Sequence, residues 1–369
     1  MNNSLAFRHA GVFLVPTVLF SFLFPAGLSA AQPADHAAAV DSLLAAYDST
    51  AAPGASVAVI ANGSVVIQRG YGYRDLETRS RILPSTNFRL ASMTKQFTAT
   101  CIMMLKEQGM LAYADPLTKF FPRFPACGRA ITIRHLLTHT SGLIDYESLL
   151  PDSQTVQITD AGVLSLLAAV DSTYFAPGTK YLYSNTGYAL LALIVEKVSG
   201  ESFAAFLTKH IFTPLAMTSS VAYERGISEV PERAYGYART DSGFVFADQS
   251  VTSAVLGDGG IYSNTNDLVK WDAALYTDKL VSTAGREESF ADAALNDGTP
   301  IDYGYGWHTE SFLGIRHPYH NGETRGFRNT ILRFPRQRLT VIILTNRNEG
   351  QPMQIAHAIA KLYLDEQKL

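Results

Sequence analysis

The sequence predicts an α/β protein in which an antiparallel sheet, built from both ends of the chain, carries an inserted helical lobe. Three observations lead to this fold class. Runs rich in β-branched residues lie near the start of the chain, similar runs fill its last seventy residues, and patterns with helical spacing occupy the long middle. A sheet that takes strands from both termini leaves the middle of the chain as an insertion.

The chain opens its fold with a predicted hairpin. Ala55–Ile60 and Val65–Tyr73 have the composition of strands. Asn62-Gly63 stands between them, and this dipeptide is a strong signal for a tight two-residue turn because both residues tolerate positive φ. We therefore expect two antiparallel strands at this point.

The middle of the chain is predicted to be helical. Apolar residues recur there three or four positions apart, and glycines such as Gly109 and Gly200 suit the helix ends. The predicted helices are Ser92–Gly109, a stretch beginning at Ile133–Leu137, Thr159–Val170, Thr186–Ser199, Ser202–His210 and Asn266–Tyr276.

The last part of the chain is predicted to supply the remaining strands. Gly314–His320, Arg325–Phe334 and Leu339–Asn346 have strand composition, and residues 335–338 form a turn between the second and the third. Gln351–Glu366 is a predicted closing helix. We expect the terminal helices to back the sheet.

Composition excludes several classes of protein. Of 369 residues, 47% are hydrophobic and 17% are charged, which is typical of a chain that buries a core and not of a disordered one. The net charge is −3 and the sequence has no basic run, so we expect no nucleic-acid partner.

Residues 1–31 are predicted to be a signal peptide. Arg8 precedes an apolar run, Val12–Phe24, and the small residues Ser29-Ala30-Ala31 follow it. This order is typical of a secretory signal with cleavage after Ala30 or Ala31. We therefore expect an exported protein, periplasmic or secreted, without a membrane span after cleavage. The alternative is an uncleaved N-terminal anchor.

The part of the chain that follows the predicted signal peptide is expected to form one domain over residues 37–369. Its sheet lobe would comprise about residues 53–90 and 300–369, and its helical lobe about residues 91–299. Cys101 falls on the apolar face of a predicted helix, where a free Cys behaves as a small hydrophobic residue, and pairing with Cys127 is the alternative.

Ser92-Met93-Thr94-Lys95 is the best candidate for catalytic chemistry. No other Ser in the chain has a Lys three residues later. On a helix this spacing places both side chains on one face. A nucleophilic hydroxyl needs a proton acceptor beside it, and a Lys whose pKa is lowered by burial or by a second cation can serve. Taken alone, the pattern also fits a simple helix cap with a solvated Lys.

A metal-dependent hydrolase is an alternative. His135 and His139 have the i, i+4 spacing of ligands on one helix, but the sequence between them lacks the Glu that serves as base in one large class of metalloproteases. Two ordinary helix histidines would give the same pattern. We expect no metal and no cofactor.

Five segments together resemble the serine β-lactamase and penicillin-binding protein superfamily, in its class C-like branch. They occur in family order and cover nearly the whole chain after the predicted signal. The segments are residues 86–99 around Ser92, residues 131–143, Pro177-Gly178-Thr179 with the following residues 183–188, residues 259–263, and His320-Asn321-Gly322 before a strand.

The resemblance implies roles for four residues. Ser92 would be the acylated nucleophile and Lys95 would help to activate it, as the S-x-x-K motif of this superfamily does. Tyr183 would be the general acid/base, and Asn185 would direct its amide toward Lys95 and the substrate. Tyr262 begins a second Tyr-x-Asn copy, but it stands in a segment that is more often structural in the family. We also expect Lys95 to stabilise a Tyr183 phenolate.

The His320-Asn321-Gly322 segment departs from its counterpart in β-lactamases, which carry Lys at its first position. The resemblance implies that Gly322 lets the strand approach substrate and that the N–H groups of Ser92 and Glu323 form an oxyanion hole. Arg325 is expected on the strand face of Glu323, where it either supplies the missing positive charge or is simply solvated. Because His titrates near pH 6.5, we expect preference for carboxylate substrates to grow as the pH falls through that range.

These observations predict a β-lactamase/transpeptidase-like fold and an exported serine hydrolase that acts on a small-molecule or peptide substrate. The bond cleaved would be an ester or amide, as in a D-peptide, a short ester or a β-lactam. Alternatives are a penicillin-binding or sensor protein that acylates without efficient turnover, and an interaction module with a relic site.

Overall fold

An antiparallel sheet that joins the two ends of the chain organises the fold. The computed structural model describes residues 1–2 and 36–366, so nearly all of the predicted signal peptide lies outside the described residues. The sheet has five strands in the order β14–β15–β16–β1–β2, and every neighbouring pair is antiparallel. The strands are β1 (Ala55–Ala61), β2 (Ser64–Tyr71), β14 (Tyr319–Thr324), β15 (Phe327–Phe334) and β16 (Leu339–Thr345). The predicted fold class is confirmed.

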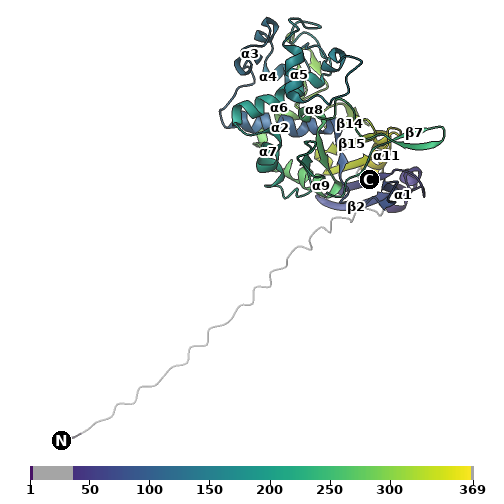
Figure 1. Ribbon diagram of the computed structural model, residues 1–369. Helices are drawn as coiled ribbons and strands as arrows, with labels where there is room; N and C mark the ends of the chain where they lie inside the picture. Colours follow the sequence, from purple (N-terminus) through teal and green to yellow (C-terminus); the bar gives the residue numbers. More distant parts are fainter. Residues whose placement is uncertain (3–35, 367–369) are drawn as a thin grey trace. The chain divides into compact units, whose positions relative to one another are not determined.

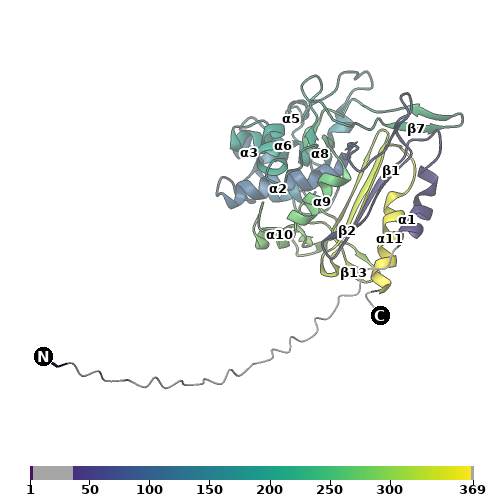
Figure 2. The same cartoon turned by 90° about the horizontal axis from the view of Figure 1, so that it is seen from below.

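Both faces of the sheet are buried at its central strand β1, and the two-residue period of this strand divides its side chains between two cores. Val57 and Val59 face helices α1 (Ala37–Leu44) and α11 (Pro352–Glu366), whereas Ala58 and Ile60 belong to the larger core. Figure 2 shows α1 and α11 on one side of the sheet and α2 (Lys95–Glu107) and α9 (Thr265–Ala274) on the other. The chain termini of the domain therefore cover the face that lies away from the inserted helices.

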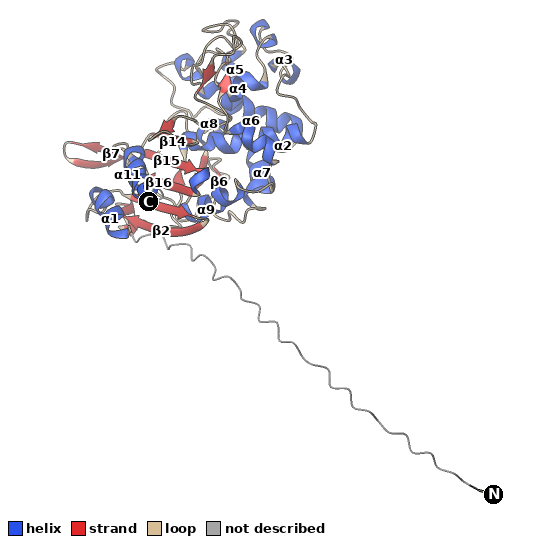
Figure 3. Cartoon of the chain, turned by 180° about the vertical axis from the view of Figure 1, so that it is seen from behind, coloured by secondary structure: helices blue, strands red, loops and turns tan. Residues whose placement is uncertain are grey.

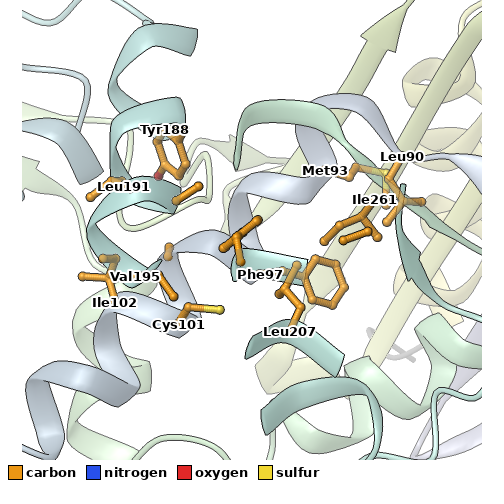
Figure 4. Close-up of a cluster of buried hydrophobic side chains, with 14 of the residues drawn as sticks. Leu90, Met93, Phe97, Cys101, Ile102, Tyr188, Leu191, Val195, Leu207 and Ile261 are labelled. Atoms are coloured by element: carbon orange, nitrogen blue, oxygen red, sulfur yellow. The ribbon is translucent and has the colours of Figure 1, made fainter. Parts of the chain in front are cut away.

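The inserted middle of the chain is mainly helical (Figure 1). Besides α2 and α9, its helices are α3 (Leu117–Phe120), α4 (Ile133–Leu137), α5 (Asp160–Leu167), α6 (Asn185–Ser199), α7 (Phe203–Leu207), α8 (Leu256–Gly259) and α10 (Thr283–Ser289). Figure 4 shows side chains of α2 and α6 meeting in the larger core, among them Cys101, Ile102, Leu191 and Val195. Cys101 and Cys127 are both free thiols.

Short strands connect these parts (Figure 3). They form one three-stranded and four two-stranded pieces. Their bounds are β3 (Tyr73–Asp75) with β4 (Ser80–Arg81), β5 (Phe88–Arg89) with β9 (Ile261–Ser263) and β6 (Val221–Ala222), β7 (Tyr237–Thr240) with β8 (Gly243–Phe246), β10 (Ala293–Ala294) with β11 (Pro300–Ile301), and β12 (Ser311–Phe312) with β13 (Ile315–Arg316).

Two predicted strands are wrong in their bounds. The strand predicted at Gly314–His320 is broken at Pro318, which has no N–H for a ladder, and β14 begins only after it. The strand predicted from Arg325 begins at Phe327 instead. Thr324 pairs with Phe327, so Arg325 and Gly326 form the turn of a two-residue hairpin. Arg325 therefore does not share a strand face with Glu323.

Candidate active site

Ser92 and Lys95 lie at the start of α2, where a 3₁₀ turn, Ala91–Thr94, leads into the helix. Lys95 is fully buried, and its Nζ makes three polar contacts. It donates to Ser92 Oγ at 3.0 Å, to Asn185 Oδ1 at 2.8 Å and to the backbone oxygen of Asp258 at 3.0 Å. These acceptors match the three N–H groups of an ammonium. The nucleophile candidate and its base candidate are therefore in direct contact.

Burial weakens the hold of Lys95 on its proton. Desolvation lowers the pKa of Lys95 to about 8, although the carboxylates of Asp258, Glu147 and Asp145 oppose the shift. Near neutral pH an appreciable fraction of the amine is then unprotonated. Such an amine can accept the Ser92 proton, which an ordinary Lys with a pKa near 10.4 could scarcely do.

Asn185 is held from its other side. It is the first residue of α6, whose N-cap Ser184 accepts a hydrogen bond from the Gly187 amide. The Asn185 Nδ2 donates to Glu147 Oε1 at 3.1 Å, which fixes the amide orientation and directs Oδ1 toward Lys95. The structure thus brings Asn185 to the place that the sequence predicts.

Tyr183 lies beside Lys95, but with its ring and not its hydroxyl. Lys95 Nζ is 4.9 Å from the ring centroid, and the Tyr183 hydroxyl has no hydrogen-bond partner among the described residues. Burial raises the pKa of Tyr183 well above its usual range, because a buried phenolate would lose its hydration. The expected phenolate is therefore not favoured in the resting site, and Lys95 is the better proton acceptor.

The second Tyr-x-Asn copy has structural contacts. The Tyr262 hydroxyl accepts from Arg233 Nη2 at 3.0 Å and from Gln249 Nε2 at 2.9 Å. Asn264 is the N-cap of α9 and accepts from the Asp267 amide. Both side chains are thus engaged in the packing of β9 and α9.

The two histidines of the metal alternative have separate environments. His135 Nδ1 accepts from the Thr132 amide in a capping box at α4. His139 Nδ1 accepts from the Ser184 amide at 3.0 Å, and its ring lies 4.2 Å from that of Tyr183. Within the part of the chain that the structure describes, no three His, Cys, Asp or Glu side chains form a group that could hold a metal ion.

His320 lies deeper than the sequence predicts. It is 1% exposed, and its Nε2 is 3.1 Å from the Tyr303 hydroxyl while Nδ1 is 2.6 Å from the Asn321 oxygen. Burial, together with Lys95 and His308, lowers the pKa of His320 well below its usual value. The expected titration of this His near pH 6.5 is therefore wrong, because desolvation and the nearby Lys95 ammonium disfavour the imidazolium.

Gly322 allows a close approach within the chain. A Cβ at this position would lie 2.0 Å from the carbonyl oxygen of Leu90, so only Gly lets β14 pack against the segment that precedes Ser92. Glu323 follows on the same strand, and its side chain forms an ion pair with Arg328 at 3.3 Å. Arg325 is exposed in the hairpin turn and does not line the cavity at Ser92.

A small cavity of about 50 Å³ opens at Ser92. Sequence reasoning missed several of its lining residues, among them Arg89, Tyr146, Glu147 and Asp258. Asp258 stands just before the Gly259-Gly260 pair that carries the family resemblance, and this was the only local signal for it. Ala91, directly before the nucleophile candidate, has φ of 51°, a left-handed conformation that is uncommon for a residue with a Cβ and is often found at functional sites.

Among the described residues, no helix combines the length and the apolar character needed to cross a bilayer.

Comparisons with known proteins identify a matching family and similar chains. A family model described as Beta-lactamase matches residues 37–365. Penicillin-binding protein 4* of Bacillus subtilis (strain 168) is 37% identical over 304 residues, which cover 78% of this chain and 66% of that protein. Protein flp of Staphylococcus aureus (strain MRSA252) is 28% identical, with 83% of this chain and 62% of that protein covered. The chain thus spans slightly under two thirds of the length of these two relatives.

Solved structures share the fold. The octameric penicillin-binding protein homologue from Pyrococcus abyssi has a TM-score of 0.77 and 29% identity, covering 89% of this chain and 76% of that chain. The D-amino acid amidase from Ochrobactrum anthropi SV3, complexed with L-phenylalanine, has a TM-score of 0.75 and 20% identity, covering 89% of this chain and 99% of that chain.

Proposed function

Because the chain belongs to the beta-lactamase family, we propose that it is an exported serine hydrolase that forms an acyl-enzyme on Ser92. The substrate would be an ester or an amide, as in a short ester, a D-peptide or a β-lactam. The observation that carries this proposal is the 3.0 Å contact between Ser92 Oγ and a fully buried Lys95 whose pKa is lowered to about 8. Export rests on the signal-like order of residues 1–31.

In the acylation step, the neutral amine of Lys95 accepts the Ser92 proton as Oγ attacks the substrate carbonyl. The backbone N–H groups of Ser92 and Glu323, which line the same cavity, would stabilise the oxyanion. When the tetrahedral intermediate collapses, the Tyr183 hydroxyl gives its proton to the leaving group. The hydroxyl must then move to within hydrogen-bond distance of Lys95, whose ammonium restores that proton. The net result is transfer of the Ser92 proton to the leaving group.

Deacylation uses the same groups in reverse order. A water molecule takes the place of the leaving group. Lys95 accepts a proton from this water as the water attacks the acyl carbonyl, and Ser92 recovers its hydroxyl hydrogen as the acid is released. Asn185, which touches Lys95 at 2.8 Å, would hold the amine in place through both steps.

Mass spectrometry of the intact protein tests the proposal directly. Incubation with a fluorophosphonate should add one label at Ser92, and the Ser92→Ala variant should take up none. Thr98→Ala, which removes a buried hydroxyl elsewhere on α2, is the matched control and should still be labelled. Full ester hydrolysis by the Ser92→Ala variant would overturn the assignment. Inhibition by a chelator but not by the fluorophosphonate would instead support the metal-dependent alternative.

A penicillin-binding protein that acylates without efficient turnover is the second candidate. It is favoured by the 37% identity to a relative named as a penicillin-binding protein. Incubation with a penicillin distinguishes the two. A burst of one equivalent followed by a stable adduct would indicate the binding protein, whereas continuous product release would indicate the hydrolase.

A further inference from the structure

A second cavity adjoins the active-site cavity at the end of β14. The cavity at Ser92 measures about 50 Å³, which accommodates little more than the reacting group. The second cavity measures about 540 Å³, within the range of small-molecule sites. Glu323 and Thr324 line both cavities, so a molecule seated at Ser92 can extend past them into the larger one.

The walls of this second cavity are held together through backbone contacts. One wall is the turn between β14 and β15, and the other is the β7–β8 hairpin, which projects beyond the sheet in Figures 1 and 2. Gly326 has φ of +74°, and a Cβ there would lie 2.2 Å from the Ala247 oxygen and 2.5 Å from Gly236 Cα. The Asn348 amide also donates to the Tyr237 oxygen at 3.0 Å. The cavity is thus built into the fold.

The hairpin wall is apolar. Val245 and Phe246 line the cavity and are 47% and 64% exposed, respectively. Phe246 is held by ring contacts with Tyr235 and Tyr237, at centroid distances of 5.9 and 6.1 Å. Single exposed apolar residues need no explanation, but two on one cavity wall provide a surface for an apolar group.

The turn wall carries a free positive charge. Two arginines line the cavity, and Arg328 is already engaged, because its Nη1 donates to the oxygens of Thr324 and Phe327 at 2.9 Å and its Nε pairs with Glu323. Arg325 is exposed and has no polar partner among the described residues. A single free guanidinium is suited to a carboxylate, which can accept two parallel hydrogen bonds from it.

We propose that this cavity binds the distal part of the substrate, and that this part is an apolar group that bears a carboxylate. The inference rests on the proposed function, since it concerns a substrate seated at Ser92. Phe246 and Val245 would contact the apolar group, and Arg325 would pair with the carboxylate. The cavity therefore selects among esters or amides by the group that lies away from the cleaved bond.

Two pairs of esters test this, each with one neutral and one anionic member. Phenyl acetate and 4-acetoxyphenylacetate differ by a carboxymethyl group on the leaving group. The 4-nitrophenyl esters of 4-phenylbutyrate and of its para-carboxylated analogue differ on the acyl group. In at least one pair, Arg325→Ala should lower the anionic-to-neutral ratio of kcat/KM about three- to fivefold, the upper range for an exposed ion pair. The ratio should also fall with added salt.

Matched variants separate this site from general surface effects. Arg336→Ala removes an exposed Arg from the turn at the other end of β15 and should leave the ratio unchanged. Phe246→Ala should raise KM for the phenyl-bearing acyl ester relative to 4-nitrophenyl acetate. Ile227→Ala, which removes an exposed apolar side chain beside a different cavity, should not.

A binding experiment keeps this inference distinct from the proposed function. Calorimetric titration of the Ser92→Ala variant with both anionic esters measures affinity without turnover, and adding Arg325→Ala should weaken binding of at least one of them. If no ester is hydrolysed but this loss of affinity is seen, the proposed function is wrong and the proposed binding role of the cavity is still supported. Equal affinities, or equal ratios of kcat/KM in the Arg325→Ala and Arg336→Ala variants for both pairs, would overturn the inference.

Discussion

Lys95 is held by the backbone carbonyl of Asp258 and not by the carboxylate of that residue. Nζ donates to the carbonyl oxygen at 3.0 Å, while the carboxylate Oδ2 accepts from the Tyr146 hydroxyl at 3.0 Å. A carboxylate in direct contact would hold the proton on Lys95 firmly. A neutral carbonyl orients the amine but stabilises its protonated form less than a carboxylate would. The effect of burial is therefore the larger one, and the pKa of Lys95 falls to about 8.

The first prediction follows from that pKa. If neutral Lys95 is the base, kcat/KM for a neutral ester should rise about tenfold per pH unit below pH 8 and level off above it. Lys95→Arg should lose orders of magnitude in kcat/KM, because a guanidinium keeps its proton. Lys106→Arg, at an exposed position later on α2, is the control. A flat profile between pH 6 and 9, or an active Lys95→Arg variant, would contradict the assignment.

The second prediction concerns the two Tyr-x-Asn copies. Tyr183→Phe removes only the hydroxyl and should lower kcat/KM by roughly 10²–10⁴, the contribution of a positioned acid or base. Tyr262→Phe should affect rate far less. It should instead lower Tm, since Arg233 and Gln249 lose a buried acceptor. Steady-state kinetics and thermal melts of both variants measure these effects. A larger loss of kcat/KM in Tyr262→Phe than in Tyr183→Phe would show that Tyr262 is the functional copy.

The third prediction concerns His320. The pKa of His320 is lowered well below its usual value, so His320 does not titrate between pH 7.5 and 6. In the wild type, titration of His320 should therefore not change the ratio of kcat/KM for carboxylate and neutral substrates over this range. His320→Lys should add a fixed cation near Lys95, raise the relative kcat/KM for a penicillin about tenfold, and shift the rising limb of the pH profile to lower pH. His320→Asn, which stays neutral, should do neither. An unchanged selectivity in His320→Lys would refute the argument.

The fourth prediction concerns stability. Burial lowers the pKa of His308 to about 4, below the value near 6.5 of the unfolded chain. Between these values the unfolded state binds more protons, so this group costs stability as the pH falls from 7 and the cost is absent above that range. The free energy of unfolding in urea should therefore drop by about 1–2 kcal/mol more between pH 7 and 5 in wild type than in His308→Asn. Parallel pH profiles for the two proteins would contradict this.

The sequence by itself determined the local elements and the spacing of the catalytic pair. Asn62 and Gly63 both have positive φ in the turn of the first hairpin, a conformation that these two residue types tolerate. The three-residue step from Ser92 to Lys95 is fixed by helical geometry, so their contact could be predicted from the motif alone. The two-ended sheet followed from the same kind of reasoning, because strand and helix periods are local properties.

Only the tertiary structure decided the electrostatics and the outer shape of the site. Asp258 reaches Lys95 across 163 positions of sequence, and no local pattern reports that contact. The same is true of the burial that keeps His320 neutral and of the turn that moves Arg325 from the active-site strand into a neighbouring cavity. These features depend on which distant segments pack together, since desolvation and charge proximity are properties of the assembled core and not of its parts.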